Sequence, residues 1–147
     1  MKNSIEFEKG KNIAIRYIGI SKKTIYEVTQ KLKLKDISFD TINEIIMYLK
    51  QLNYLNDKEY INCFISQNIR FEKYSIFEIK QKLKLKGIDL KKYDEEFYIL
   101  NDIEYEKNVI KKLKKFKLKN YDEIKIKKYL YNRGFKIRED WYCYDTT

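Results

Sequence analysis

The chain has 147 residues, of which 44% are hydrophobic and 37% charged, so it can bury a core beneath a densely ionic surface. It contains no His, which removes the commonest general base and the commonest metal ligand, and it has no glycine-rich phosphate-binding motif. The net charge of +10 favours polyanionic or acidic partners. We therefore predict a binding protein rather than an enzyme, with no catalytic residue, no metal site and no cofactor.

The same composition bears on the cellular compartment. No run of apolar residues is long enough to cross a bilayer, and Met1–Gly10 lacks the apolar centre of a signal peptide. Cys63 and Cys143 lie far apart without a CxxC pair, which predicts two reduced thiols, one of them buried. A cytoplasmic protein without membrane contact is expected, and we expect a monomer.

Few residues in the chain interrupt a helix. Proline is absent, and glycine occurs only at positions 10, 19, 87 and 134. The predicted fold class is therefore all-α. Residues 4–8 fit a short strand or a frayed end equally well, and the sequence does not choose between them.

The first strongly patterned element is Lys22–Ile37. Thr24 and Glu27 have the spacing of a capping box, which places a helix start here. One helical stripe of apolar residues follows: Ile25, Val28 and Leu32. Asp36 stands where a helix end favours a left-handed residue. Residues 31–35 alternate like a strand, but five residues do not overrule the helical frame around them.

Two helices are predicted between this element and its next copy. Asp40 can cap one that runs to Asn53, with an apolar face on one side: Ile42, Ile45, Leu49 and Leu52. Asn56 or Asp57 can cap the other, for which we predict inward-facing side chains at Tyr60, Cys63 and Phe64.

The chain then repeats its first element. Lys73–Ile88 is identical to Lys22–Ile37 at ten of sixteen positions. Ser75 and Glu78 renew the capping box, and Gly87 replaces the aspartate at the helix end. An internal repeat of this kind is typical of helical repeat proteins.

A third and weaker copy spans Asn120–Phe135, with Asp122 at the cap position and Gly134 at the helix end. We expect equivalent stripe positions to be buried in all three copies: Val28, Leu32, Ile79, Leu83, Ile126 and Leu130. Leu34 and Leu85 fall off this stripe, at a neighbouring contact or at the surface.

Further helices are predicted over three ranges: 93–100, 104–118 and 137–144. The repeating unit is then a helix triplet about every 45 to 50 residues, and neighbours must stack because one triplet cannot bury its apolar face alone. The predicted organisation is an N-terminal arm, two repeats, and a third repeat with the C-terminal tail: 1–10, 11–56, 57–101 and 102–147.

The positive charge is concentrated late in the chain. Residues 102–140 contain 13 basic and 7 acidic residues, against 9 and 8 in residues 57–101. The candidates for binding nucleic acid or a nucleoprotein filament are Lys111, Lys112, Lys114, Lys115, Lys117, Lys119, Lys127, Lys128 and Arg133. A solvated amphipathic helix explains the run equally well, with a seam at Ile110, Leu113 and Phe116 or Lys117. Because Lys far outnumbers Arg, sequence-tolerant phosphate contact is favoured over base readout.

Aromatic residues and carboxylates have structural interpretations as well as functional ones. The 14 Tyr and 8 Phe residues are potential stacking platforms for a single strand, but their place on the apolar stripes favours the core. Aromatic residues near the end either close the last repeat or form an exposed contact: Trp141, Tyr142 and Tyr144. We interpret the acidic cluster at 94–96 as a solvated face.

The repeated segments resemble the RecX family, regulators of the bacterial recombinase RecA. The resemblance covers residues 12–140 and is carried by three segments: Ala14–Ile37, Leu49–Ile65 and Ile76–Asp89. The family's Leu-Gly-Tyr-Leu-Asp-Asp turn reads Leu52–Asp57 here, with Asn53 in place of glycine. Asp36 departs from the pattern in the same way.

The resemblance implies three tandem three-helix repeats in an elongated, curved array. It also implies non-enzymatic binding along the groove of the RecA–DNA filament, with inhibition of the recombinase. The implied partners are the RecA filament and, in a weak and sequence-tolerant manner, the DNA phosphate backbone. A general nucleic-acid-binding helical protein and a helical scaffold for an acidic protein partner remain as alternatives.

Overall fold

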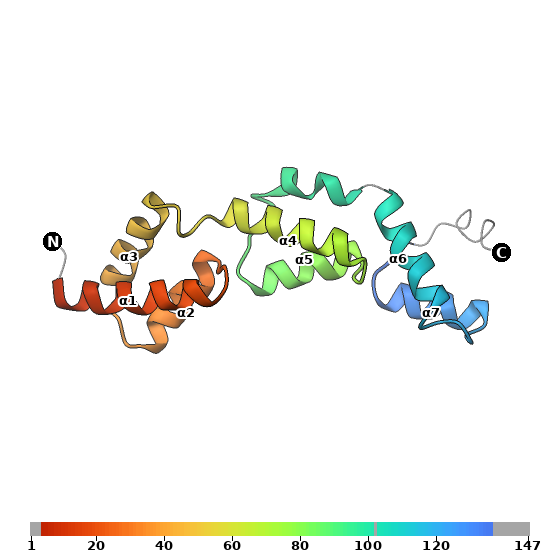
Figure 1. Cartoon of the computed structure of the whole chain (residues 1–147), viewed down its shortest axis with the longest axis horizontal. Helices are drawn as coiled ribbons and strands as arrows, with labels where there is room; N and C mark the ends of the chain where they lie inside the picture. The colour runs from red at the N-terminus through yellow and green to blue at the C-terminus, as the bar shows by residue number, and fades with distance from the viewer. Residues whose placement is uncertain (1–3, 102, 137–147) are drawn as a thin grey trace. The chain divides into compact units, whose positions relative to one another are not determined.

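The computed structural model describes residues 4–101 and 103–136, which are helical with no strand among them (Figure 1). This confirms the predicted all-α class. The helices are α1 (Ser4–Ile20), α2 (Ile25–Leu34), α3 (Phe39–Gln51), α4 (Asp57–Phe71), α5 (Ile76–Leu85), the 3-10 helix η1 (Asp94–Asn101), α6 (Ile103–Lys115) and α7 (Glu123–Asn132). No helix in this part of the chain is long and apolar enough to cross a membrane. The helix expected at 137–144 lies outside the described residues, together with the terminal aromatic side chains and Cys143.

The chain divides into two compact units. The first comprises Met1–Asn62 and Leu83–Asp89, and the second comprises Cys63–Lys82 and Leu90–Thr147. The chain therefore leaves the first unit within α4 and returns to it at the end of α5. The repeat boundaries drawn from the sequence remain a prediction.

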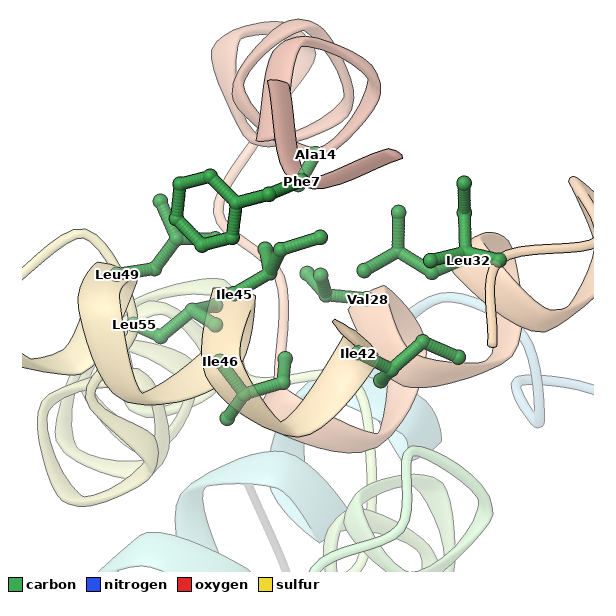
Figure 2. Packing of buried hydrophobic residues seen from close by; sticks show 10 residues of the cluster. Phe7, Ala14, Val28, Leu32, Ile42, Ile45, Ile46, Leu49 and Leu55 are labelled. Carbon is green, nitrogen blue, oxygen red and sulfur yellow. The ribbon is translucent and has the colours of Figure 1, made fainter. Parts of the chain in front are cut away.

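The core of the first unit lies among α1, α2 and α3. Figure 2 shows Phe7 and Ala14 of α1 pointing toward Ile45 of α3 and Val28 of α2. The other buried members are Leu32, Ile37, Ile42, Ile46, Leu49 and Leu55. Gly10 permits the close contact between helices, because a Cβ there would lie 2.5 Å from Ile45 Cδ1. Residues 4–8, for which the sequence left a strand or a frayed end open, form the start of α1.

The second unit has its own set of buried apolar side chains. They are Ile65, Ile79, Phe97, Leu100, Tyr105, Val109, Ile110, Leu118, Leu130 and Phe135. The Tyr105 hydroxyl donates a hydrogen bond to the Tyr74 carbonyl at 2.7 Å, so the one polar atom of this aromatic ring is satisfied. Burial, followed by the negative charge of Glu106, raises the pKa of Tyr105 to about 12.

The repeated stripe is largely as predicted. The buried members are Val28, Leu32, Ile79, Leu83 and Leu130, whereas Ile126 is half-buried. The alternating segments at 31–34 and 82–85 are helical. Leu34 and Leu85, which fall off the stripe, are exposed at the surface.

The predicted bounds and cap of α3 were wrong, whereas one of the two caps predicted for α4 is confirmed. α3 begins at Phe39 with Ser38 in the cap position, so Asp40 lies in the first turn instead. The helix ends before Asn53, which adopts a left-handed conformation with φ of 60°. Asn56 caps α4, because its side-chain oxygen accepts a hydrogen bond from the Glu59 N–H at 3.0 Å.

The inward face of α4 also differs from the prediction. The buried side chains are Ile61, Ile65 and Asn68. The predicted residues, Tyr60, Cys63 and Phe64, are only half-buried. The true stripe follows the two isoleucines at i and i+4, and the larger aromatic side chains lie on its flanks. Because Cys143 lies outside the described residues, the expectation that one of the two thiols is buried stays a prediction.

Aromatic side chains are less buried than the sequence suggested. Among the described residues, only Phe7, Phe97, Tyr105 and Phe135 are buried. The helix predicted over 93–100 is the 3-10 helix η1 at Asp94–Asn101, and α6 ends at Lys115 rather than at residue 118. Because the chain turns after Lys115, Leu118 takes the buried position predicted for Phe116, whose ring is 68% exposed.

Candidate nucleoprotein-binding face

Within the first unit, a residue at the start of α2 is hydrogen-bonded to the chain just after the end of α5. The Thr24 hydroxyl accepts a hydrogen bond from the Glu27 N–H at 3.1 Å and donates one to the Lys86 carbonyl at 2.7 Å. Glu27 completes the capping box by accepting from the Thr24 N–H at 3.0 Å. Thr24 is fully buried, so one hydroxyl both caps a helix and joins two copies of the repeated element.

Three further contacts connect the start of α2 with the end of α5 or with α4, and we call the whole set of contacts the first joint. Glu27 forms an ion pair with Lys86 at 3.8 Å, and the Asp57 carboxylate accepts from the Ile25 N–H at 2.9 Å. The Tyr26 side chain lies over Gly87, whose φ of 81° is the left-handed value that a helix end favours. The joint therefore combines two side chains that accept from N–H groups at the start of α2, Thr24 and Asp57, with an ion pair and an aromatic ring packed over a glycine.

The second unit contains the same joint between α5 and α7. The Ser75 hydroxyl donates to the Arg133 carbonyl at 2.7 Å, and Arg133 Nη2 donates to Glu78 at 2.8 Å. Phe77 lies over Gly134, as Tyr26 lies over its glycine. Arg133 is thus half-buried and bound to a carboxylate, and the structure places this predicted binding residue inside a joint.

Glu106 holds the second joint from the α6 side. Its carboxylate accepts from the Ile76 N–H at 3.0 Å and from the Lys136 N–H at 3.0 Å. The side chain is only 3% exposed, and both of its oxygens have a donor. A buried carboxylate with two backbone donors is a fixed structural element rather than an acid–base group in contact with solvent.

The opposite face of α6 is basic and exposed. Tyr105, Val109 and Ile110 are buried on one side of the helix. Exposed ammonium groups lie elsewhere on α6 and in the turn after it: Lys111, Lys112, Lys115, Lys117 and Lys119. In the described part of the chain, none of these five has a carboxylate within ion-pair distance. We call these five residues the α6 lysine face.

Beside this face lies a groove of about 640 Å³, which we call the aromatic groove. It is lined from the end of α4 by Phe71, Glu72, Lys73 and Tyr74, and from the end of α6 by Lys112, Leu113, Phe116 and Lys117. Phe71 and Phe116 are more than half exposed, at 63% and 68%. Exposed rings beside ammonium groups can stack planar groups while the rim contacts phosphate.

Hydrogen bonding and cation–π contacts shape the groove. Lys112 Nζ donates to the Phe71 carbonyl at 3.2 Å, which satisfies a free acceptor at the end of α4 and links the two walls. The Lys115 ammonium lies 5.6 Å from the Phe116 ring centroid. Lys117 lies 5.1 Å from the Tyr129 ring on α7. The ammonium groups of Lys115 and Lys117 therefore lie near aromatic rings while both residues stay exposed.

The structure brings only some of the predicted residues together. Lys112 and Lys117 line the groove, and the rest of the α6 lysine face is adjacent in sequence. Lys114 is half-buried, whereas Lys127 and Lys128 are exposed on α7. Sequence reasoning missed the groove's aromatic wall: Phe71 and Tyr74. Phe71 is the last residue of α4 and lies off the buried stripe of that helix, which was the signal that could have identified the wall. No group of metal-binding side chains occurs among the described residues.

The two joints and the repeated capping boxes define the class of the molecule: an all-helical protein in which one set of helix contacts occurs twice, with an exposed basic face. No protein-family model matches the chain. Regulatory protein RecX of Caldanaerobacter subterraneus subsp. tengcongensis is 32% identical over 136 residues, covering 92% of this chain and 68% of that protein. The chain belongs to the RecX family.

Other relatives agree with this assignment. Regulatory protein RecX of Streptococcus gordonii is 34% identical over 142 residues, and these cover 91% of this chain and 54% of the relative. The chain thus spans about half the length of the streptococcal relatives it matches. The crystal structure of RecX from Lactobacillus salivarius has a TM-score of 0.76 at 29% identity, covering 94% of this chain and 92% of that one. A second RecX crystal structure, at 21% identity, shows the same fold with a TM-score of 0.76.

Proposed function

We propose that this chain is a non-enzymatic regulator that binds the RecA–DNA filament and inhibits the recombinase. The observation that carries the proposal is the α6 lysine face, whose five ammonium groups have no carboxylate partner among the described residues and lie beside exposed aromatic rings. Family membership supports the regulatory role, because the matched relatives are regulatory proteins by name.

The α6 lysine face supports contact with the DNA phosphates of the filament. Each lysine that neutralises a phosphate releases condensed counterions, so such binding is strong at low salt and insensitive to base sequence. Lysine is suited to this contact because it acts as a point charge, without the planar fork by which arginine recognises guanine. Ion pairs at an exposed surface contribute only about 0–1 kcal/mol each to the stability of a fold. The five lysines of the α6 lysine face, which have no carboxylate partner among the described residues, are therefore not needed to stabilise this fold.

The aromatic groove, which shares Lys112 and Lys117 with the α6 lysine face, supports a second kind of contact. Phe71 and Phe116 expose most of their rings, and exposed rings stack unpaired bases regardless of sequence. Lys73 and Lys117 also line the groove, and we propose that their ammonium groups contact the neighbouring phosphates. A single strand, which RecA binds in its filament, can stack its bases on the rings and contact the lysines with its phosphates. A continuous duplex keeps its bases stacked on one another and can contact only the lysines.

The ATPase activity of RecA on single-stranded DNA tests the proposal. We expect the chain to lower this activity in proportion to its concentration. A variant with Lys112, Lys115 and Lys119 changed to Glu should lose most of the effect at low salt. An unchanged ATPase rate at every ratio of protein to RecA would contradict the proposal.

The same assay separates the alternatives. The aromatic groove favours a general single-strand-binding protein as the second candidate, because stacking needs no recombinase. Tight binding to bare single-stranded DNA with no effect on RecA would support that candidate. Binding to neither DNA nor filament would favour a scaffold for an acidic protein.

A further inference from the structure

The two joints use the same set of positions. Each takes a hydroxyl, an aromatic ring and a glutamate from one helix start: Thr24, Tyr26 and Glu27 in the first joint, and Ser75, Phe77 and Glu78 in the second. Each takes a basic residue and a glycine from the other helix end: Lys86 and Gly87, and Arg133 and Gly134. Two corresponding surfaces are not used in either joint, namely the helix end of the first copy and the helix start of the third.

The glycine in each joint is required by space as well as by backbone conformation. A Cβ at Gly87 would lie 2.2 Å from Tyr26 Cβ, and one at Gly134 would lie 2.7 Å from Phe77 Cδ1. The first copy has Asp36 at this position, with φ of 58°. Its Cβ therefore projects where the ring of an incoming helix start would have to lie.

The helix start of the third copy carries the complementary changes. Asp122 replaces the hydroxyl, and its carboxylate already accepts from the Lys125 N–H at 2.8 Å. A carboxylate has no proton to donate to a helix-end carbonyl. Lys125 replaces the glutamate, which reverses the charge, and Ile124 stands in place of the ring with 78% of its side chain exposed.

We infer that these substitutions block head-to-tail association of two copies through the joint. Docking the third-copy start of one molecule on the first-copy end of another would set Lys125 beside Lys35. It would place the Asp122 carboxylate against the Lys35 carbonyl, and Ile124 against the Asp36 Cβ. All three joint interactions are replaced by repulsion or overlap.

Such a block has a physical purpose. A head-to-tail contact between identical molecules does not close on itself, so it builds open filaments. A repeat protein whose two end surfaces could form the same joint with another copy would assemble into such filaments. Like-charge repulsion or steric overlap at those surfaces prevents this assembly. The block rests on the joints alone and is independent of the proposed binding to RecA.

A variant that restores the joint tests the inference. The changes Asp36→Gly, Asp122→Ser and Lys125→Glu rebuild the glycine, the hydroxyl and the acid without altering the net charge. Sedimentation equilibrium should show a mass for this variant that grows with concentration, while the parent shows no such growth. A mass equal to that of the parent at every concentration, with helical content preserved, would overturn the inference.

Separating the changes gives a second, more specific readout. One protein carries Asp36→Gly and the other carries Asp122→Ser with Lys125→Glu, so each has one repaired and one blocked surface. Neither should associate alone, and a mixture should form a one-to-one complex that does not grow further. A charge-neutral control at exposed sites, Asp40→Ser, Glu95→Ser and Lys33→Glu, should not associate. Association of the control to the same degree would show that the joint is not responsible.

Discussion

The Ser75 hydroxyl donates a hydrogen bond to the Arg133 carbonyl at 2.7 Å, across 58 positions of sequence. The Thr24 hydroxyl makes the same bond to Lys86, also at 2.7 Å. A capping residue usually serves only its own helix. Here each capping hydroxyl also donates a hydrogen bond to the end of a second helix. The repeated sequence segments therefore make the same contacts in the structure.

The double role of Ser75 makes it sensitive to truncation. Replacing an N-cap serine by alanine costs about 0.5–2 kcal/mol of stability, and Ser75→Ala also leaves the Arg133 carbonyl without its donor. We expect Ser75→Ala to destabilise the protein toward the upper end of that range in urea unfolding. The exposed Ser66→Ala within α4 is the matched control and should change stability little. Equal effects would contradict the joint.

Glycines at the joints should respond differently from a glycine elsewhere. Gly87→Ala and Gly134→Ala each place a Cβ within 3 Å of a ring at positive φ, so both should destabilise by more than about 1 kcal/mol. Gly19 lies within α1 with nothing near its missing Cβ, so Gly19→Ala should stabilise by up to about 1 kcal/mol. Thermal unfolding of the three variants measures this, and a uniform response would argue against the steric account.

Glu106 should be required for stability. Its two part-buried backbone donors, Ile76 and Lys136, would lose their acceptor in Glu106→Ala, so we expect this variant to be destabilised by about 1–3 kcal/mol in total. Glu106→Gln keeps one acceptor oxygen and should lose less. The exposed Glu95→Ala serves as the control. Urea unfolding that ranks Ala, Gln and parent in any other order would contradict the assignment.

Tyr105 should make stability fall at alkaline pH. Its folded-state pKa is raised to about 12 from the ordinary 10.0, so the native state favours the protonated phenol. The resulting stability is fully present below pH 10 and is lost as the pH rises toward 12. Chemical denaturation across this range, compared with Tyr105→Phe, measures the contribution. A parent and variant with parallel pH dependence would contradict it.

The α6 lysine face predicts a localised electrostatic effect. Changing Lys112, Lys115 and Lys119 to Glu should weaken binding to single-stranded DNA strongly at low salt and less at high salt, where screening already removes the attraction. The matched control changes Lys9, Lys33 and Lys50, which are exposed in the first unit. Fluorescence anisotropy across a salt series compares them. Equal losses would mean that only the whole-protein field matters.

Much of the fold was predictable because its signals are local. Capping boxes and apolar spacing located α2 and α5, and the left-handed residues at their ends followed from backbone sterics. The phase of α4 was not predictable, since Tyr60 and Ile61 are both apolar enough to face inward and tertiary packing decided between them. The double role of Thr24 was also hidden, because its partner Lys86 is distant in the sequence.

The candidate site was predicted only in part. The run of lysines identified α6, but Arg133 belongs to a joint whose acid, Glu78, lies in another copy. The aromatic groove depends on where α6 ends. The turn after Lys115 buries Leu118 and leaves Phe116 in solvent, and no local pattern distinguishes these two apolar residues.

Binding to a preformed RecA filament on single-stranded DNA tests the central claim most directly. The labelled chain should bind the filament more tightly than bare single-stranded DNA at the same salt concentration, because protein and phosphate contacts act together. The Lys112, Lys115 and Lys119 to Glu variant should lose most of its affinity for the filament. Affinity for the filament no greater than for bare DNA, or a triple variant that binds the filament as well as the parent, would contradict the account.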